Sequence, residues 1–346
     1  MEKKVTIHDI AREAGVSSCC VSWVLSNHPR SKVVSEKTRQ RILSLSKRMG
    51  YLRNSMASAI RTGQVNTIAL IVDFAKIQSF HSSSQILTGI IMESTARRYS
   101  VKIYDENELD VSFRQIAENR IEKVISLSGG ATIRERTAEL AEKFGLNLVY
   151  CYEHGHRGFP AVNTDNVTMT AEAVHYIAEH GHSRIGLICG PHLSYHAKER
   201  HAGYLRGMEE CGLKIDPRWV SCSGKTEDAV GAMLALPKKL RPTAFVTLSD
   251  TVAAQAQRFA WERGLRIPED FSVVGIGNTE VSRSAMVPIT SFREALPESG
   301  RLLMRLVLGE KPDFPPDEFN VYRTRAEMVE RKSVFNRSNP KTKRKD

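Results

Sequence analysis

Strand-like and helix-like segments alternate along this chain from residue 65 onward, and this alternation limits its fold more than any other feature. Short apolar runs predict strands, and the amphipathic stretches between them predict helices. The predicted strands are 68–72, 101–104, 124–127, 147–151, 185–189, 244–247 and 272–276, and the predicted helices include 86–99, 169–180 and 199–211. Such alternation predicts parallel sheets with helices on both faces. About 270 residues of it predict two doubly wound lobes, with ligands near the carboxyl ends of their strands.

The first fifty residues follow a different, all-helical pattern. Two short helices are predicted over 7–14 and 17–25, with a turn at Gly15 between them, and a third helix over 36–49. Thr6 starts the first helix in a capping-box pattern, and glycine suits the left-handed backbone that ends a helix. Two short helices joined by such a turn form a helix-turn-helix motif, which we therefore predict within a small three-helix domain.

Charge is distributed unevenly between these two regions. Residues 1–62 contain 12 Lys/Arg against 4 Asp/Glu, whereas residues 63–330 contain 31 against 34. A basic module on a slightly acidic body indicates a polyanionic partner, although a helical hairpin for protein contacts is an alternative. In a helix-turn-helix domain the start of the second helix enters the major groove of DNA, and nearby hydroxyl groups contact phosphates. We therefore predict DNA contacts by Thr6, Ser17, Ser18, Cys19, Cys20, Ser22, Trp23 and Asn27.

Segments with a familiar pattern are spread over nearly the whole chain: 5–17, 21–25, 34–39, 50–51, 54, 61–63, 67–71 and 327–333. In these segments the chain resembles the LacI/GalR family of bacterial transcription regulators. The resemblance implies a homodimer that binds a pseudo-palindromic operator on double-stranded DNA and represses transcription. It also implies control by a small, sugar-like effector and a body of the periplasmic-binding-protein type.

The resemblance sets the predicted domain borders. The domains are a helix-turn-helix DNA-binding domain at 1–50, a hinge helix or linker at 51–63, an effector-binding and dimerisation domain at 64–333, and a disordered basic tail at 334–346. Within the third of these, lobe 1 is expected to comprise 64–162 and 291–321, and lobe 2 to comprise 163–290 and 322–333.

The hinge segment carries a helical pattern over 54–61, which is too short to be stable alone in water. In the resembling family this helix folds on operator DNA, pairs with its dimer mate and inserts an apolar side chain into the minor groove, which kinks the duplex. Arg53 replaces the usual proline and Ile60 the usual leucine, so we expect a differently tuned hinge, with a plain linker as the alternative. The hinge residues implied to contact DNA are Asn54, Ala57, Ile60 and Arg61.

The resemblance also implies an effector site between the lobes, formed by Phe80, Ser194, His196, Arg200, Lys225, Ser249, Gly277 and Asn278. Arg200 is the central candidate, because its planar guanidinium can hold paired hydroxyls, a carboxylate or a phosphate. Gly277 stands where the family has an aspartate that accepts hydrogen bonds from sugar hydroxyls. This loss predicts a more cationic cleft and an effector with an anionic group, such as a sugar acid or a phosphorylated sugar. The alternative is a degenerate pocket without a small ligand.

Other classes of protein lack support in the sequence. The six cysteines include no Cys-x-x-Cys, which argues against a disulfide framework or a zinc ribbon. No apolar run reaches the length of a membrane helix and the first residues lack a secretory signal, so we expect a cytoplasmic protein. Catalytic motifs are missing, and Gly275-x-Gly277 is only a fragment of a dinucleotide-binding motif, so we expect no enzyme, no cofactor and no metal. The alternative function is a cytoplasmic small-molecule-binding protein with degenerate DNA reading.

Overall fold

The computed structural model describes residues 5–26, 28–52, 65–74, 81–189, 194–221 and 224–338, with His81 described by its backbone alone. The chain divides into two compact units, residues 1–65 and 66–346, which we call the head and the body. Among the described residues, no helix is both long enough and apolar enough to cross a membrane.

The head contains the three predicted helices and one further short turn. Its elements are α1 (Ile7–Ala14), α2 (Ser18–Leu25), the 3₁₀ helix η1 (Pro29–Val33) and α3 (Glu36–Arg48). The predicted capping box is present, since the Thr6 hydroxyl accepts from the Asp9 N–H and the Asp9 carboxylate accepts from the Thr6 N–H at 3.0 Å. Gly15 ends α1 in the left-handed region, with φ of 63°, which glycine adopts at little cost. The core of the head contains Ile10, Ala11, Ala14, Val21, Val24, Ile42 and Leu45.

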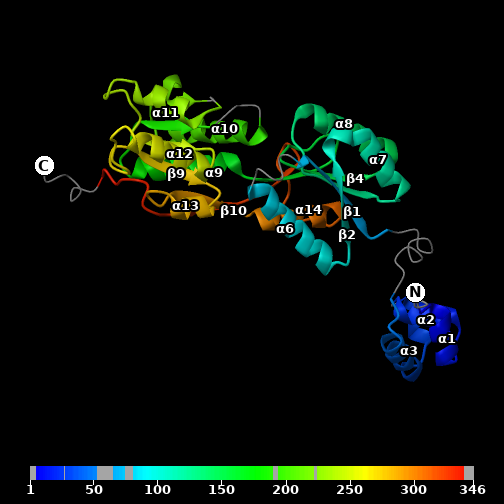
Figure 1. Cartoon of the computed structure of the whole chain (residues 1–346). Coiled ribbons are helices and arrows are strands. Elements are labelled where there is room, and N and C mark those ends of the chain that lie inside the picture. The colour runs from blue at the N-terminus through cyan, green and yellow to red at the C-terminus, as the bar shows by residue number, and fades with distance from the viewer. Residues whose placement is uncertain are drawn as a thin grey trace. The chain divides into compact units, whose positions relative to one another are not determined.

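The described part of the body contains two six-stranded sheets, one in each lobe (Figure 1). The lobe 1 sheet has the order β11-β5-β4-β3-β1-β2 and consists of β1 (Thr67–Val72), β2 (Ser100–Asp105), β3 (Lys123–Ser126), β4 (Asn147–Cys151), β5 (Ala161–Thr164) and β11 (Val321–Thr324). The lobe 2 sheet has the order β12-β10-β9-β8-β6-β7 and consists of β6 (Ile185–Ile188), β7 (Val220–Ser221), β8 (Ala244–Thr247), β9 (Ser272–Ile276), β10 (Thr290–Glu294) and β12 (Ala326–Val329). Among these strands only the edge pair β10–β12 is antiparallel.

Helices accompany both sheets, as the alternation predicts. Lobe 1 carries α6 (His81–Ala96), η2 (Glu106–Glu108), α7 (Leu109–Glu118), α8 (Ala131–Phe144) and α14 (Leu296–Val307). Lobe 2 carries α9 (Asn166–Glu179), α10 (Tyr195–Glu210), η3 (Pro217–Trp219), α11 (Thr226–Leu234), α12 (Asp250–Trp261) and α13 (Glu280–Ser284). The predicted fold class is therefore confirmed: an all-α helix-turn-helix head and an α/β body of two doubly wound lobes.

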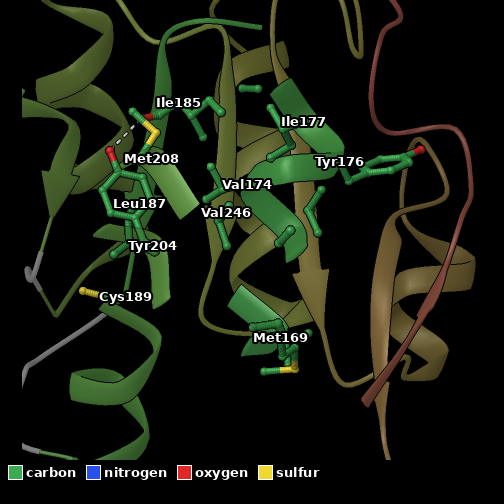
Figure 2. Close-up of a cluster of buried hydrophobic side chains, with 14 of the residues drawn as sticks. Met169, Val174, Tyr176, Ile177, Ile185, Leu187, Cys189, Tyr204, Met208 and Val246 are labelled. Carbon is green, nitrogen blue, oxygen red and sulfur yellow. Dashed lines mark hydrogen bonds between the residues drawn. The ribbon is translucent and has the colours of Figure 1, made fainter. Parts of the chain in front are cut away.

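The core of lobe 2 lies on both faces of its sheet. On one face, Val246 packs against α9 and α10, where the Tyr204 hydroxyl donates to the Ile185 carbonyl at 2.9 Å (Figure 2). On the other face, the preceding residue Phe245 packs against α11 and α12. Because successive strand side chains point to opposite faces, the apolar run 244–247 is buried on both sides of the sheet.

The chain crosses between the lobes three times, and each crossing lies slightly later than predicted. β5 remains in lobe 1 through Thr164, β10 remains in lobe 2 through Glu294, and β11 remains in lobe 1 through Thr324. A border inside a strand would divide its hydrogen-bonded ladder between two sheets, so each crossing falls where a strand ends. This corrects the borders predicted near 163, 291 and 322.

The first residues after lobe 2 are packed, although a disordered tail was predicted from residue 334. The Phe335 N–H donates to Ser272 Oγ at 3.0 Å. Val334 packs against the lobe 2 core. Residues 334–338 therefore belong to lobe 2, while residues 339–346 lie outside the described residues.

His182, beneath this C-terminal segment, makes lobe 2 sensitive to acid. Its Nε2–H donates to the Phe335 carbonyl at 2.9 Å, and in the neutral ring Nδ1 accepts from the Thr243 hydroxyl at 2.9 Å. Burial lowers the pKa of His182 from 6.5 to about 4. As pH falls, the unfolded chain therefore binds a proton before the folded protein does. We expect the free energy of unfolding to decrease between pH 6.5 and about 4.

The urea midpoint across this pH range measures the effect. His182→Gln should flatten the decline, because glutamine does not take up a proton in the unfolded chain. His175→Gln is the control, since that side chain is 38% exposed on α9. Declines of equal steepness in the two variants would contradict this prediction.

Candidate DNA-binding helix and inter-lobe site

The N-terminal end of α2 is capped and accessible, as DNA contact requires. The Ser17 hydroxyl caps the helix by accepting from the Cys20 N–H at 3.2 Å. Cys19 is exposed and Ser18 half-exposed, whereas Cys20 packs against the core of the head. Ser22 is only 9% exposed, so its hydroxyl offers a phosphate less surface than predicted. Ser18 and Cys19 are therefore the residues in the first turn of α2 that are accessible for contact with base edges.

Trp23 lies near the other end of α2, half-buried against η1. Its ring stacks on His28, with centroids 6.4 Å apart, and Arg30 Cζ lies 5.8 Å from the ring centroid. The base contact predicted for Trp23 therefore competes with contacts inside the head. Six predicted contact residues lie outside the described residues and remain predictions: Asn27, Asn54, Ala57, Ile60, Arg61 and Phe80.

Arg200 lies at the centre of the inter-lobe site, and its guanidinium is already engaged. It projects from α10, and its side chain is 9% exposed. Nε donates to Asn166 Oδ1 at 2.8 Å, Nη1 to the Leu248 carbonyl at 2.5 Å and Nη2 to Glu294 Oε1 at 3.3 Å. Burial lowers the pKa of Arg200, and the adjacent Glu294 opposes that shift. Among the described residues, three of the five guanidinium N–H groups have a partner within the protein.

Arg200 belongs to a network of polar contacts that joins the three crossings. Asn166, just after the first crossing, donates from Nδ2 to Glu199 Oε2 at 3.0 Å. Glu199 pairs with Arg323 of β11 at 2.7 Å, and Arg323 also pairs with Asp317 at 2.8 Å. Because Arg323 belongs to lobe 1 and Glu199 to lobe 2, the Glu199–Arg323 ion pair links the lobes. A ligand that displaces one of these contacts would therefore act on the arrangement of the lobes.

Two aromatic rings meet across the lobe boundary near Arg200. Tyr152 follows β4 in lobe 1, His196 lies in the first turn of α10, and their ring centroids are 5.1 Å apart in an edge-to-face arrangement. Ser83 Oγ lies 3.4 Å from the Tyr152 hydroxyl. Burial, with the charges of Arg200 and Arg323, lowers the pKa of His196 to about 3. His196 is therefore neutral near pH 7 and does not supply the positive charge that the sequence suggested.

The other predicted effector residues mostly serve the protein itself. The hydroxyls of Ser194 and Ser249 cap α10 and α12. Asn278 Oδ1 accepts from Arg331 Nη2 at 2.5 Å, which ties it to the C-terminal segment. Lys225 precedes α11 and gives that helix no side-chain cap. Of the predicted effector residues that the structure describes, Ser194, Ser249 and Asn278 are therefore already engaged in contacts within lobe 2.

Although Gly277 lacks the carboxylate that the family has at this position, the Asp250 carboxylate lies beside it. Its φ is 121°, and a Cβ there would lie 3.5 Å from Asp250 Oδ2. The buried Asp250 carboxylate accepts from the Thr279 N–H at 2.6 Å and from the Ser291 hydroxyl at 2.5 Å. A second carboxylate at position 277 would repel this one and strain its own backbone. Because Asp250 is already present, Arg200 pairs with Glu294 and His196 is neutral, these residues supply less net positive charge than the sequence suggested.

Sequence reasoning missed two serines at the carboxyl end of β3. Ser126 and Ser128 are 1% and 2% exposed, and their hydroxyls have no hydrogen-bond partner among the described residues. Doubly wound sheets bind ligands at this end of their strands, so the position of both serines just after an apolar run was the available signal. Asn166 and Glu294 were also missed, because only the fold brings them to Arg200.

Known proteins share both parts of this architecture. Residues 6–54 match the family described as "Bacterial regulatory proteins, lacI family", and residues 174–334 match the periplasmic binding protein-like domain. The HTH-type transcriptional repressor CytR of Escherichia coli strain K12 is 30% identical over 325 residues, which cover 89% of this chain and 90% of CytR. This chain belongs to the LacI family.

Other transcription regulators match this chain over nearly their whole length. The repressor PurR of Aliivibrio fischeri strain MJ11 is 26% identical over 347 residues, covering 96% of this chain and 99% of PurR. The structure of the Lac repressor dimer bound to operator and the anti-inducer ONPF has the same fold, with a TM-score of 0.75 at 21% identity and coverage of 96% and 100%. The structure of the regulator CelR in complex with cellobiose matches with a TM-score of 0.65 at 25% identity, and the match covers 95% of this chain and 100% of CelR. As a LacI-family member, the chain is a DNA-binding transcriptional repressor and not an enzyme.

Proposed function

We propose that this LacI-family repressor acts in the cytoplasm as a homodimer on a pseudo-palindromic operator, and that a small, sugar-like effector between the lobes controls it. The observation that carries the proposal is the capped, accessible N-terminal end of α2 in a basic head. A helix end of this kind enters the major groove, and two heads related by twofold symmetry read two half-sites. The hinge at 51–63, with Ile60 as its wedge, would add the minor-groove contact.

Lobe 1 offers a surface that suits a homodimer. Four large apolar side chains on neighbouring elements are 45–53% exposed: Ile91 and Met92 of α6, Ile103 of β2 and Val111 of α7. β2 contacts both helices, so these side chains belong to one region of the lobe. Gathered apolar groups favour a protein contact, and a twofold dimer covers the same surface on both copies.

Selection of bound sequences from random duplex DNA tests the proposed operator reading. The full-length protein should enrich a palindromic consensus of about 14–20 base pairs, because two half-sites about one helical turn apart span that length. Replacing Ser18 and Cys19 together by alanine should alter or abolish the consensus. Arg48→Ala is the control, because Arg48 lies at the end of α3, away from α2, and pairs with Glu13. Enrichment without any consensus would contradict sequence-specific reading.

The proposed effector lies where the Arg200 network joins the crossings. The aromatic pair, and the Ser126 and Ser128 hydroxyls that have no hydrogen-bond partner among the described residues, suit a hydroxylated ring. Because Arg200 and Arg323 are already paired with carboxylates, the network favours a sugar without net charge over the anionic one predicted from the sequence. The solved CelR–cellobiose complex, at 25% identity, supports a sugar-like ligand. Such coupling typically means that the effector changes the affinity of the protein for its operator 5–150-fold, which corresponds to about 1–3 kcal/mol.

Isothermal titration calorimetry with matched neutral and anionic sugars tests the effector proposal. We expect binding heat with a neutral sugar, and a weaker signal in His196→Ala, which loses one ring of the aromatic pair. Arg206→Ala, at an exposed position on the same helix, should bind like the wild type. Binding of the anionic sugar alone would contradict the charge argument. Absence of heat from either sugar would favour the degenerate pocket.

A further inference from the structure

An aromatic–cation stack lies at the end of α2, away from the edge that meets bases. Arg30 Cζ is 5.8 Å from the centroid of the Trp23 ring, within the range of a cation–π interaction. His28 stacks on the same ring, with centroids 6.4 Å apart and the ring planes 23° from parallel. The Trp23 ring therefore supports one side chain from η1 and one from the residue that caps η1.

Backbone contacts hold this stack together. The His28 N–H donates to the Trp23 carbonyl at 3.0 Å, which ties the start of η1 to α2. His28 Nδ1 accepts from the Arg30 N–H at 3.1 Å, and Pro29 restricts φ at the first position of η1. These contacts hold the backbone of Arg30 close to the end of α2, so the guanidinium reaches the Trp23 ring without a change of backbone.

Arg30 presents an uncompensated positive charge to solvent. It is exposed, and no carboxylate of the described residues forms an ion pair with it. Lys32, also exposed, lines a hollow of about 540 Å³ between η1 and the start of α3. Arginine and lysine are the residues that neutralise DNA phosphates. The indole of Trp23, by contrast, has one N–H donor and no acceptor, so it distinguishes bases poorly.

The position of the stack along α2 suits a contact with the DNA backbone. Trp23 follows Ser18 by five residues, which corresponds to about 7.5 Å along a helix. The major groove is about 12 Å wide and is bordered by phosphates on both sides. When the start of α2 faces base edges, a cation beside Trp23 is therefore at the distance of the groove wall.

We propose that Trp23 is a positioning residue that holds Arg30 against a backbone phosphate, so that η1 is a second DNA-contacting element beside α2. The inference rests on the proposed docking of α2 in the major groove. It replaces the base contact predicted for Trp23 by a contact that carries no sequence information. Trp23 then contributes affinity and salt dependence rather than site preference.

DNA binding by the full-length protein over a range of salt concentrations tests this inference. The variants are Trp23→Ala, Arg30→Ala and their combination, each measured on the selected operator and on an unrelated duplex. Each single variant should lower the slope of log Kd against log salt by about one per head, and the double variant should lower it no further. Trp23→Phe should restore the slope, because phenylalanine also offers a ring face to the guanidinium. The selected consensus should stay unchanged in every variant.

Arg48→Ala is the matched control, since it removes the same charge from a residue that pairs with Glu13 at 3.3 Å. It should change the slope less than Arg30→Ala does. Additive losses in the double variant would overturn the proposal, and so would a Trp23→Ala protein with an altered consensus and an unchanged slope. If thermal melting shows that Trp23→Ala does not fold, Trp23→Leu takes its place, because leucine keeps an apolar side chain without a ring face. A wild-type protein that selects no consensus would contradict the proposed function, whereas the slopes on the unrelated duplex would still decide this inference.

Discussion

Replacing Arg200 with methionine is expected to cost the body about 3–5 kcal/mol of its free energy of unfolding. Methionine fills much of the same space without a charge, so Glu294, whose side chain is 8% exposed, would keep a buried carboxylate without its cation. Asn166 Oδ1 and the Leu248 carbonyl would also lose their donor. Each buried polar group left without a partner costs about 1–3 kcal/mol.

The urea midpoint of the body measures this loss. Arg200→Met combined with Glu294→Gln should be less destabilised than Arg200→Met alone, because the unpaired carboxylate is gone. Arg206→Ala is the control on the same helix: Arg206 is 51% exposed and pairs with Glu210, so its loss should change stability by less than about 1 kcal/mol. Equal midpoints for Arg200→Met and Arg206→Ala would show that the Arg200 contacts do not stabilise the body.

Replacing Gly300 with alanine is expected to destabilise lobe 1 by about 1–3 kcal/mol, although alanine favours helices. α14 crosses α6 so closely that a Cβ on Gly300 would lie 2.2 Å from the Ile86 carbonyl oxygen. A Cβ on Gly89 of α6 would lie 2.0 Å from the Pro297 carbonyl oxygen. Both contacts involve backbone, so the two helices must move apart and lose core packing.

A second glycine provides a control for this prediction. Gly231 lies in the middle of α11. A Cβ added there would have Phe259 Cζ as its nearest neighbour, at the ordinary van der Waals distance of 3.5 Å. Gly231→Ala should therefore stabilise lobe 2 by about 0.5–1 kcal/mol, because alanine loses less backbone freedom on folding. Urea midpoints that shift in opposite directions are the expected result. A shift in the same direction for both variants would contradict a close crossing of α6 and α14.

Helices and strands whose bounds are set by residues close together in the chain could be predicted from the sequence. Thr6, Gly15 and Ser35 mark helix ends in the head because a cap is formed by residues a few positions apart, and the helices begin and end at them. The apolar runs at 244–247 and 272–276 were predicted with their exact bounds as β8 and β9. Both runs are buried on two faces, so every residue in them is apolar or small.

Strands near the crossings could not be predicted in this way. β5, β10, β11 and β12 mix apolar residues with Asn163, Arg293 and Arg323, so none of them stands out as a strand. Each is held by a partner strand that is distant in sequence, such as β11 beside β5. The lobe borders were therefore misplaced, because they depend on which sheet each of these strands joins.

By itself the sequence determined the helices of the head, the two-lobed body and the central position of Arg200, because these follow from neighbouring residues and from the chemistry of one side chain. Only the tertiary structure decided the charge of the inter-lobe site. The partners of Arg200 are Asn166, Leu248 and Glu294, which are 34, 48 and 94 residues away along the chain. Folding brings them within 3.3 Å of the guanidinium and places the half-buried His196 one helical turn before it. The balance of charge and protonation there depends on these surroundings, since burial penalises every charge that lacks a partner.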